Sequence, residues 1–464
     1  MGLIGISSPE LSGHDEPRVA GIAREMALRD DYAVPRLNGR PFLEYPSLGY
    51  LPQALLSRLT GRESEFLAVL PTLLFALGTV WLTYRMGCLL GGERVGLNAG
   101  FLLQTTAEFL NLHRKCLVDP ALLFFITFSL YGFLAWHSGG SSVRYRAFFY
   151  LGLSGAFLTK GLVGVGLPAA VVLVFLLLAK DWTALKKLLL GWPIVFFFLP
   201  IALWGYEVDR SGGLGLVEEV LRQSVQRFLS SSADHSNPPW YYLAPLSYMF
   251  VPWILIPIFL LWLRFGPAKW EEGFSLGREN LFPKVWFLTI TLVLLLAAAK
   301  RKLYLAPLLP AFALLASVWW ERIRIRLAVP RKREIAVLAG FLPLMAVVQF
   351  GFLLPREREE SFREIFQLVK KEQAGAQVVL YSPSEAMRGA NVFYLGRVSP
   401  VIGDPEGIRS YLTEGSKKIF VVSVGGNLED PFEGTKTLHP VYLLGSKKMK
   451  SRRVSVYSTQ LPGR

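Results

Sequence analysis

Residues 161–179 read GLVGVGLPAAVVLVFLLLA, an apolar stretch without a single charged side chain. A helix of this length crosses the roughly 30 Å hydrocarbon core of a membrane. Hydrophobic residues make up 52% of the 464-residue chain and charged residues only 18%, a composition too apolar for an ordinary soluble enzyme. The sequence therefore predicts a polytopic α-helical membrane protein.

Other apolar stretches of similar length flank this one, and together they predict about ten membrane-spanning helices. They are 66–84, 95–112, 120–136, 147–159, 188–206, 240–263, 285–299, 303–320 and 335–355. Alternate loops collect Lys and Arg, from Arg85 and Arg94 to the basic run at 322–333, which marks the cytoplasmic side of a membrane protein. In a bacterium the other loops, both ends of the chain included, then face the periplasm across the inner membrane.

The net charge of +15 has two readings. In a soluble protein it would raise the possibility of nucleic-acid binding, but no recognition motif accompanies the charge. Cytoplasmic loops of membrane proteins collect Lys and Arg, which accounts for the excess. We therefore expect membrane lipids and no nucleic acid as partners. The two cysteines, Cys88 and Cys116, define neither a disulfide framework nor a metal-ligand spacing.

Three regions follow from these patterns. Residues 1–65 form a first outer loop, in which helical spacing at 17–28 and a segment after the 41–46 turn predict interfacial helices. Residues 66–355 form the transmembrane core. Residues 356–464 predict a small C-terminal α/β soluble domain, with a helix at 361–372 and strands near 377–381, 418–424 and 454–458.

The first outer loop carries about 60 residues to the periplasm without a preceding apolar span. We therefore expect that the true start lies upstream and that one N-terminal helix is missing. A natural truncation is the alternative.

Six motifs occur in order along the chain: HDEPRVAGIAREM (14–26), VPRLNGRPFLEYPSLGY (34–50), LVDP (117–120), FLTKG (157–161), HSNPPWYYL (235–243) and KRKLYLAPLLPA (300–311). This set resembles the polyprenyl-phosphate-sugar glycosyltransferases of the GT-C superfamily. That superfamily includes the lipid A aminoarabinose transferases and the protein O-mannosyltransferases of the family 39 type. The C-terminal domain is similar in placement to the soluble domain of the aminoarabinose transferases.

The resemblance implies an inverting transfer of a sugar from undecaprenyl phosphate to an envelope acceptor, such as lipid A, on the periplasmic face. An acceptor hydroxyl must lose a proton and the departing phosphate must be stabilised, by cationic side chains or a divalent metal ion. The resemblance implies that Asp15 is the catalytic base, and Asp119 is a second candidate catalytic acid. Asp119 precedes Pro120, so it equally suits the start of a helix.

Several other residues are candidates to bind the substrate or the lipid phosphate. Related enzymes often carry a Lys after the acid at Glu44, where this chain has Tyr45. Lys160, a single cation between two apolar spans, is the best replacement for that charge, although it could also snorkel from a turn. The remaining candidates are Glu16, Arg18, Arg227, Lys300, Arg301, Tyr241 and Tyr242. Glu16 and Arg18 also suit the ordinary stabilisation of a helix N-terminus, and the tyrosines suit an interfacial aromatic belt.

Glu44 and His235 could supply two ligands of a divalent metal site, and no organic cofactor is expected. Three alternative functions stay open. The first is protein O-glycosyl transfer by the same superfamily, and the second is a lipid or sugar transporter or flippase. A transporter predicts mid-span charges and a repeat between two halves, whereas the charges here gather at the outer ends of spans. A scaffold, or a homologue without activity, is the third.

Overall fold

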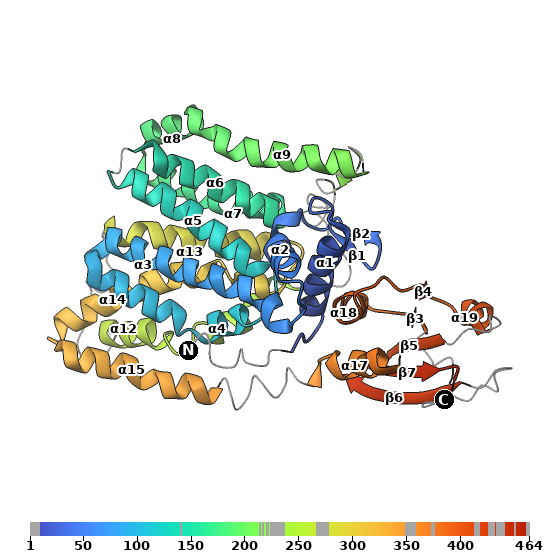
Figure 1. Ribbon diagram of the computed structural model, residues 1–464. Coiled ribbons are helices and arrows are strands. Elements are labelled where there is room, and N and C mark those ends of the chain that lie inside the picture. The colour runs from blue at the N-terminus through green and yellow to red at the C-terminus, as the bar shows by residue number, and fades with distance from the viewer. Residues whose placement is uncertain are drawn as a thin grey trace.

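The computed structural model describes residues 10–139, 142–212, 215, 218–219, 222, 237–265, 278–348, 359–372, 376–412, 418–425, 432, 441–449 and 452–460. Long helices pack side by side in one body, and a sheet domain lies at one end of them (Figure 1). The chain is therefore predominantly helical with a small C-terminal α/β domain, as the sequence predicts.

Helix α3 (Glu65–Gln104) folds back on itself as a hairpin. Its backbone is non-helical at Gly91 and at Gly92, whose φ of 83° is readily adopted only by glycine. The two arms touch closely, since a Cβ on Gly87 would lie 2.7 Å from the Cα of Gly96. The two spans predicted at 66–84 and 95–112 are these arms. The second arm ends at Gln104, and a short helix, α4 (Ala107–His113), follows it.

Most other predicted spans coincide with helices. They are α5 (Asp119–His137), α6 (Val143–Lys160), α7 (Leu162–Ala179), α9 (Val195–Gly212), α13 (Arg278–Leu296), α14 (Leu308–Arg326) and α15 (Arg331–Val348), with a short α8 (Trp182–Leu189) before α9. Among the described residues, α3, α5 and α7 are long and apolar enough to cross a membrane. A bent pair formed by α8 and the helix after it makes a fourth if it is counted as one span.

The prediction of one continuous span at 240–263 is wrong. The structure divides this segment into η4 (Pro239–Tyr242), α11 (Leu243–Tyr248) and α12 (Leu255–Phe265). Pro252 lies in the interruption, where proline removes a backbone donor and crowds the preceding turn. A hydrogen bond joins this interruption to the break between α3 and α4, since the Ala107 amide donates to the Val251 carbonyl at 2.9 Å. One backbone group at each break is thereby satisfied.

The first outer loop contains α1 (Asp15–Arg29), β1 (Arg36–Leu37), β2 (Arg40–Pro41), η1 (Ser47–Gly49) and α2 (Leu51–Thr60). The predicted helix at 17–28 is present, but its apolar face packs inside the protein. Val19, Ile22 and Met26 are each at most 2% exposed. Leu59 of α2, in contrast, is 80% exposed. The interfacial prediction therefore suits α2 better than α1.

The C-terminal domain is a five-stranded sheet in the order β4-β3-β5-β7-β6. Its strands are β3 (Gln377–Tyr381), β4 (Val401–Ile402), β5 (Lys418–Gly425), β6 (Tyr442–Met449) and β7 (Arg452–Ser458); its helices are α17 (Arg363–Glu372), α18 (Glu385–Leu395) and α19 (Pro405–Leu412). Alternate residues of β3 face two apolar clusters, one shared with α17 and α18 and the other with α19. The predicted strands are confirmed. β6 was not predicted, because YLLGSKKM lacks the alternation of a half-buried strand.

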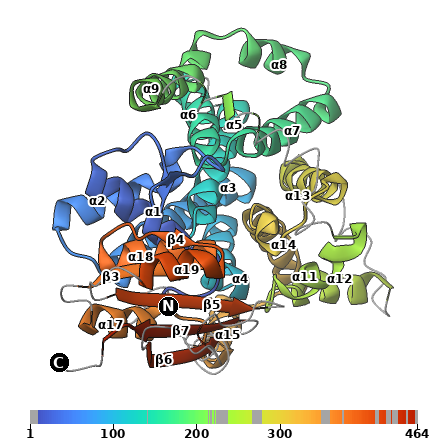
Figure 2. The same ribbon diagram turned by 90° about the vertical axis from the view of Figure 1, so that its right-hand side faces the viewer.

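Helix α18 packs against α1, so that two helices from opposite ends of the chain are in contact (Figures 1 and 2). A Cβ on Gly389 would lie 2.2 Å from the Pro17 carbonyl oxygen, and one on Gly21 would lie 2.3 Å from the Gly389 carbonyl oxygen. Nearby, Asn38 of the first outer loop donates from Nδ2 to the Ser399 carbonyl at 2.8 Å. It also accepts, at Oδ1, from the Asn391 side chain at 3.1 Å. The C-terminal domain is therefore fixed to the first outer loop by backbone contact and buried hydrogen bonds.

Gly389→Ala should weaken this contact, because the added methyl group would overlap backbone atoms of α1. Overpacking of this kind costs about 1–3 kcal/mol, so the midpoint of thermal unfolding of the detergent-solubilised protein should fall. Gly166→Ala on α7 is the matched control, since a Cβ there meets no atom within 4 Å. Equal midpoints for both variants would contradict the close contact.

Candidate active site

Asp15 lies at the first residue of α1, and two arginines bind its carboxylate. Arg18, one helical turn later, donates from Nη2 to Oδ1 at 2.6 Å. Arg301, in the loop before η6 (Lys302–Leu305), donates from Nη2 to Oδ2 at 2.6 Å. The structure thus brings together three residues that the sequence singled out, one of which, Arg301, comes from a distant part of the chain.

The charges around Asp15 favour its ionised form. Burial alone would raise the pKa of this carboxyl, but the hydrogen bond with His14 and the charges of Arg18 and Arg301 outweigh it. They hold the pKa of Asp15 well below its usual range. Asp15 is therefore a carboxylate at neutral pH, able to accept a proton.

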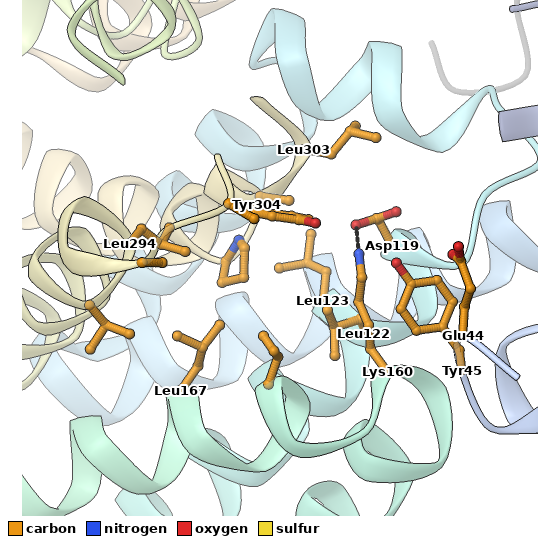
Figure 3. A pocket seen from close by; sticks show the side chains of 16 residues that line it. Glu44, Tyr45, Asp119, Leu122, Leu123, Lys160, Leu167, Leu294, Leu303 and Tyr304 are labelled. Carbon is orange, nitrogen blue, oxygen red and sulfur yellow. Dashed lines mark hydrogen bonds and ion pairs between the residues drawn. The ribbon is translucent and has the colours of Figure 1, made fainter. Parts of the chain in front are cut away.

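A second ion pair, between Asp119 and Lys160, is almost fully buried. Lys160 Nζ lies 2.6 Å from Asp119 Oδ1, and the two side chains are 7% and 8% exposed. Nζ also lies 5.5 Å from the centre of the Tyr45 ring and 5.1 Å from that of Tyr304, which is a cation–π arrangement. Figure 3 shows the ion pair beside both rings. Lys160 is therefore not a snorkelling side chain, and Asp119 binds it rather than capping α5.

Two adjoining cavities meet at this ion pair. Both are lined by Tyr45, Asp119, Lys160, Leu303 and Tyr304. One also contains the polar trio Asp15, Arg18 and Arg301. The other adds Glu44 and a wall of aliphatic side chains, among them those of Leu122, Leu123, Leu167 and Leu294. In Figure 3 the charged groups gather at one end and the leucines extend from it. The site thus offers charge at one end and an apolar chamber beside it.

Other candidates lie elsewhere. Lys300 donates from Nζ to the Ala297 carbonyl at 2.6 Å, so it binds the backbone just after α13. Glu16 accepts from the Cys116 amide at 3.1 Å and from the Ser12 hydroxyl at 3.1 Å, which ties α1 to the segment before α5.

The two predicted tyrosines form an aromatic contact of their own. The rings of Tyr241 and Tyr242 lie 5.4 Å apart. Neither is among the residues that line the two cavities in the described part of the chain. Arg227 and His235 lie outside the described residues.

Sequence reasoning missed two residues at the site. Tyr304 lines both cavities, and its signal was its place in the motif at 300–311 that resembles the GT-C enzymes. Glu385 of the C-terminal domain accepts from Arg18 Nη1 at 2.7 Å. Glu385 had no local signal, because only the packing of α18 on α1 brings it to Arg18.

The described residues offer no further ligands for the predicted metal site. There, no group of three or more His, Cys, Asp and Glu side chains is arranged to hold a metal ion. Glu44 lines the apolar cavity, and its predicted partner His235 is not described. The pair of metal ligands therefore stays a prediction.

Comparison with known proteins gives matches in sequence and in structure. Residues 45–204 match the family of dolichyl-phosphate-mannose-protein mannosyltransferases. An undecaprenyl phosphate-α-4-amino-4-deoxy-L-arabinose arabinosyl transferase from Edwardsiella ictaluri is 30% identical over 327 residues, which cover 67% of this chain and 55% of that protein. One from Proteus mirabilis is 28% identical over 64% of this chain and 53% of its own length. The chain thus spans little more than half the length of these curated relatives.

The crystal structure of ArnT from Cupriavidus metallidurans bound to undecaprenyl phosphate is similar throughout. The TM-score is 0.79 at 19% identity, and the match covers 99% of this chain and 96% of that one. The matches in sequence confirm the resemblance to the GT-C superfamily that the motifs carry. The match in structure shows that the chain has the same fold as this ArnT.

Lys160→Met should destabilise the protein strongly, because it leaves the Asp119 carboxylate buried without its cation. Breaking one partner of a buried pair costs about 3–5 kcal/mol. In the double variant Lys160→Met with Asp119→Asn, much of this loss should be recovered, as measured by thermal unfolding in detergent. Additive losses from the two substitutions would show that the two side chains do not interact.

The lowered pKa of Asp15 predicts a specific pH dependence of stability. The ionised carboxylate stabilises the folded state at every pH above its unfolded pKa of about 3.9. That contribution is lost as the pH falls below this value, toward the lower folded pKa. As the pH falls from 8 to 5, the difference in unfolding midpoint between the wild type and Asp15→Asn should not shrink, and it should shrink below pH 4. A difference that shrinks between pH 8 and pH 5 would contradict the lowered pKa.

Proposed function

We propose that the protein is an inverting membrane glycosyltransferase that moves a sugar from undecaprenyl phosphate to an envelope acceptor such as lipid A. The observation that carries the proposal is the Asp15 carboxylate, held by Arg18 and Arg301 beside an apolar chamber. The names of the relatives, which describe arabinosyl transfer from an undecaprenyl phosphate donor, support it.

The transfer needs one proton acceptor and one site for negative charge. Asp15 takes the proton of the acceptor hydroxyl, whose oxygen forms a bond to the anomeric carbon as the bond to the donor phosphate breaks. The electron pair of that bond stays on the departing phosphate, and attack from the opposite face inverts the anomeric centre. Arg301, Arg18 and Lys160 are the cations near enough to bind the phosphate. The phosphate competes with Asp15 for the guanidinium groups, which would make the carboxylate a stronger base.

The polyprenyl chain suits the apolar chamber, whose aliphatic wall leads from the charged end into the helical body. The proposal includes about ten membrane spans. It places the first outer loop and the C-terminal domain on the periplasmic side of the inner membrane. The alternation of basic loops supports that orientation. The transporter alternative has less support, since the charged groups converge on one site at the ends of α1, α5 and α6.

A protein acceptor is the second candidate, favoured by the family of protein mannosyltransferases matched at residues 45–204. The similarity of the whole chain, C-terminal domain included, to ArnT favours a glycolipid acceptor. The proposal also includes a divalent cation bound by Glu44 and His235. Treatment with EDTA should then lower transfer and added Mg²⁺ or Mn²⁺ should restore it; full activity in EDTA would remove the metal from the proposal.

Asp15→Asn should lower the rate of transfer by about 10²–10⁴-fold, the contribution of a general base. The assay uses the purified protein with radiolabelled undecaprenyl phosphate sugars, and with lipid A and a peptide as acceptors. Asp30→Asn is the matched control, because Asp30 is an exposed aspartate at the other end of the same helix. Equal transfer by Asp15→Asn and wild type would reject Asp15 as the base, and label on the peptide alone would favour the protein acceptor.

A further inference from the structure

The guanidinium group of Arg18 bridges two carboxylates from opposite ends of the chain. Nη2 donates to Asp15 Oδ1 at 2.6 Å, and Nη1 donates to Glu385 Oε2 at 2.7 Å. Arg18 is only 7% exposed. Its Cζ atom lies 5.4 Å from the centre of the Phe42 ring. The donors of an arginine form a rigid planar group. The hydrogen bond from Nη1 to Glu385 therefore fixes the orientation of the Nη2 donor that binds Asp15.

Glu385 is itself held in place. It lies in the first turn of α18, where the Ser384 hydroxyl accepts from the Met387 amide at 3.3 Å and caps the helix. One turn later, Gly389 is in backbone contact with Pro17 and Arg18 of α1. The relative position of Glu385 and Arg18 is therefore set by the contact between the two helices.

This arrangement has a chemical consequence for Asp15. An arginine with no second partner tends to bind a carboxylate with both branches of its fork, which occupies both oxygens. Arg301 already binds Oδ2. With Nη1 donating to Glu385, Arg18 gives Asp15 a single hydrogen bond, from Nη2 to Oδ1. Asp15 Oδ2, which Arg301 binds, then keeps lone-pair capacity for an acceptor hydroxyl. The negative charge of Glu385 also offsets part of the Arg18 charge.

We propose that Glu385 is a positioning residue for Asp15, acting through Arg18, so that the C-terminal domain completes the active site. This inference rests on the proposed function, since it concerns the transfer reaction. It assigns the C-terminal domain a part in catalysis beyond covering α1.

A structural role for Glu385 is the competing explanation. An acidic residue in the first turn stabilises a helix through the helix dipole, and α18 holds the C-terminal domain on α1. That role predicts that Glu385 acts on stability alone. It also predicts the same effect on kcat from the loss of an equivalent first-turn acid elsewhere in the domain, such as Glu364 of α17.

The test compares the steady-state kinetics of Glu385→Gln with those of the wild type, using the full-length protein and the transfer assay above. We expect kcat to fall by roughly ten- to a hundred-fold, the loss typical of a misplaced catalytic group, with little change in the KM for the donor. Glu385→Asp, which keeps the charge, should lose less. Glu364→Gln is the matched control, because Glu364 is also a first-turn acid of the C-terminal domain, on α17, and pairs with Lys447 rather than with Arg18. It should keep kcat.

A second measurement places the effect on Arg18. In an Arg18→Gln background, Glu385→Gln should cause no further loss of kcat, whereas a structural role would add its loss again. This comparison is between folded variants, with unfolding midpoints measured alongside.

Three results would overturn the inference: a wild-type kcat for Glu385→Gln, an equal loss for Glu364→Gln, or a full additional loss in the Arg18→Gln background. If Asp15→Asn abolishes transfer while Glu385→Gln does not, this inference fails and the proposed function stands. If the wild type transfers no sugar, both fail.

Discussion

The carboxylate of Asp15 is the point at which the parts of this molecule meet. Arg18 binds it from the same helix, and Arg301 binds it from the loop that follows α13. These two guanidinium groups compensate the negative charge of a carboxylate that is partly withdrawn from water. The contact between Asp15 and Arg301 therefore requires the first outer loop to pack against the loop that follows α13. The C-terminal domain covers α1 from the other side.

The neighbouring ion pair, Lys160 with Asp119, solves a related problem inside the helical body. A cation between two apolar spans needs a partner, and it has a carboxylate and two aromatic rings. The Tyr45 ring of the first outer loop lies beside the Lys160 ammonium, so the positive charge at this end of the cavity comes from α6.

Hydropathy predicted the position of most long helices, because a long apolar run in a membrane has few stable conformations other than a helix. It was wrong at 240–263, where hydropathy does not register the proline-containing break between α11 and α12. The site was predictable in part. Asp15, Arg18, Asp119, Lys160 and Arg301 stood in motifs that resemble a known superfamily and do meet in space, whereas Lys300 and Glu16 stood in the same motifs and bind elsewhere.

By itself the sequence determined the membrane class, the order of most helices, the α/β nature of the C-terminal domain and the superfamily. These properties depend on composition and local pattern, which are read along the chain. Only the tertiary structure decided that Arg301 rather than Lys300 binds Asp15, that Lys160 is paired rather than exposed, and that Glu385 contacts Arg18. Such choices depend on the direction of each side chain and on contacts between distant segments, and packing alone sets them.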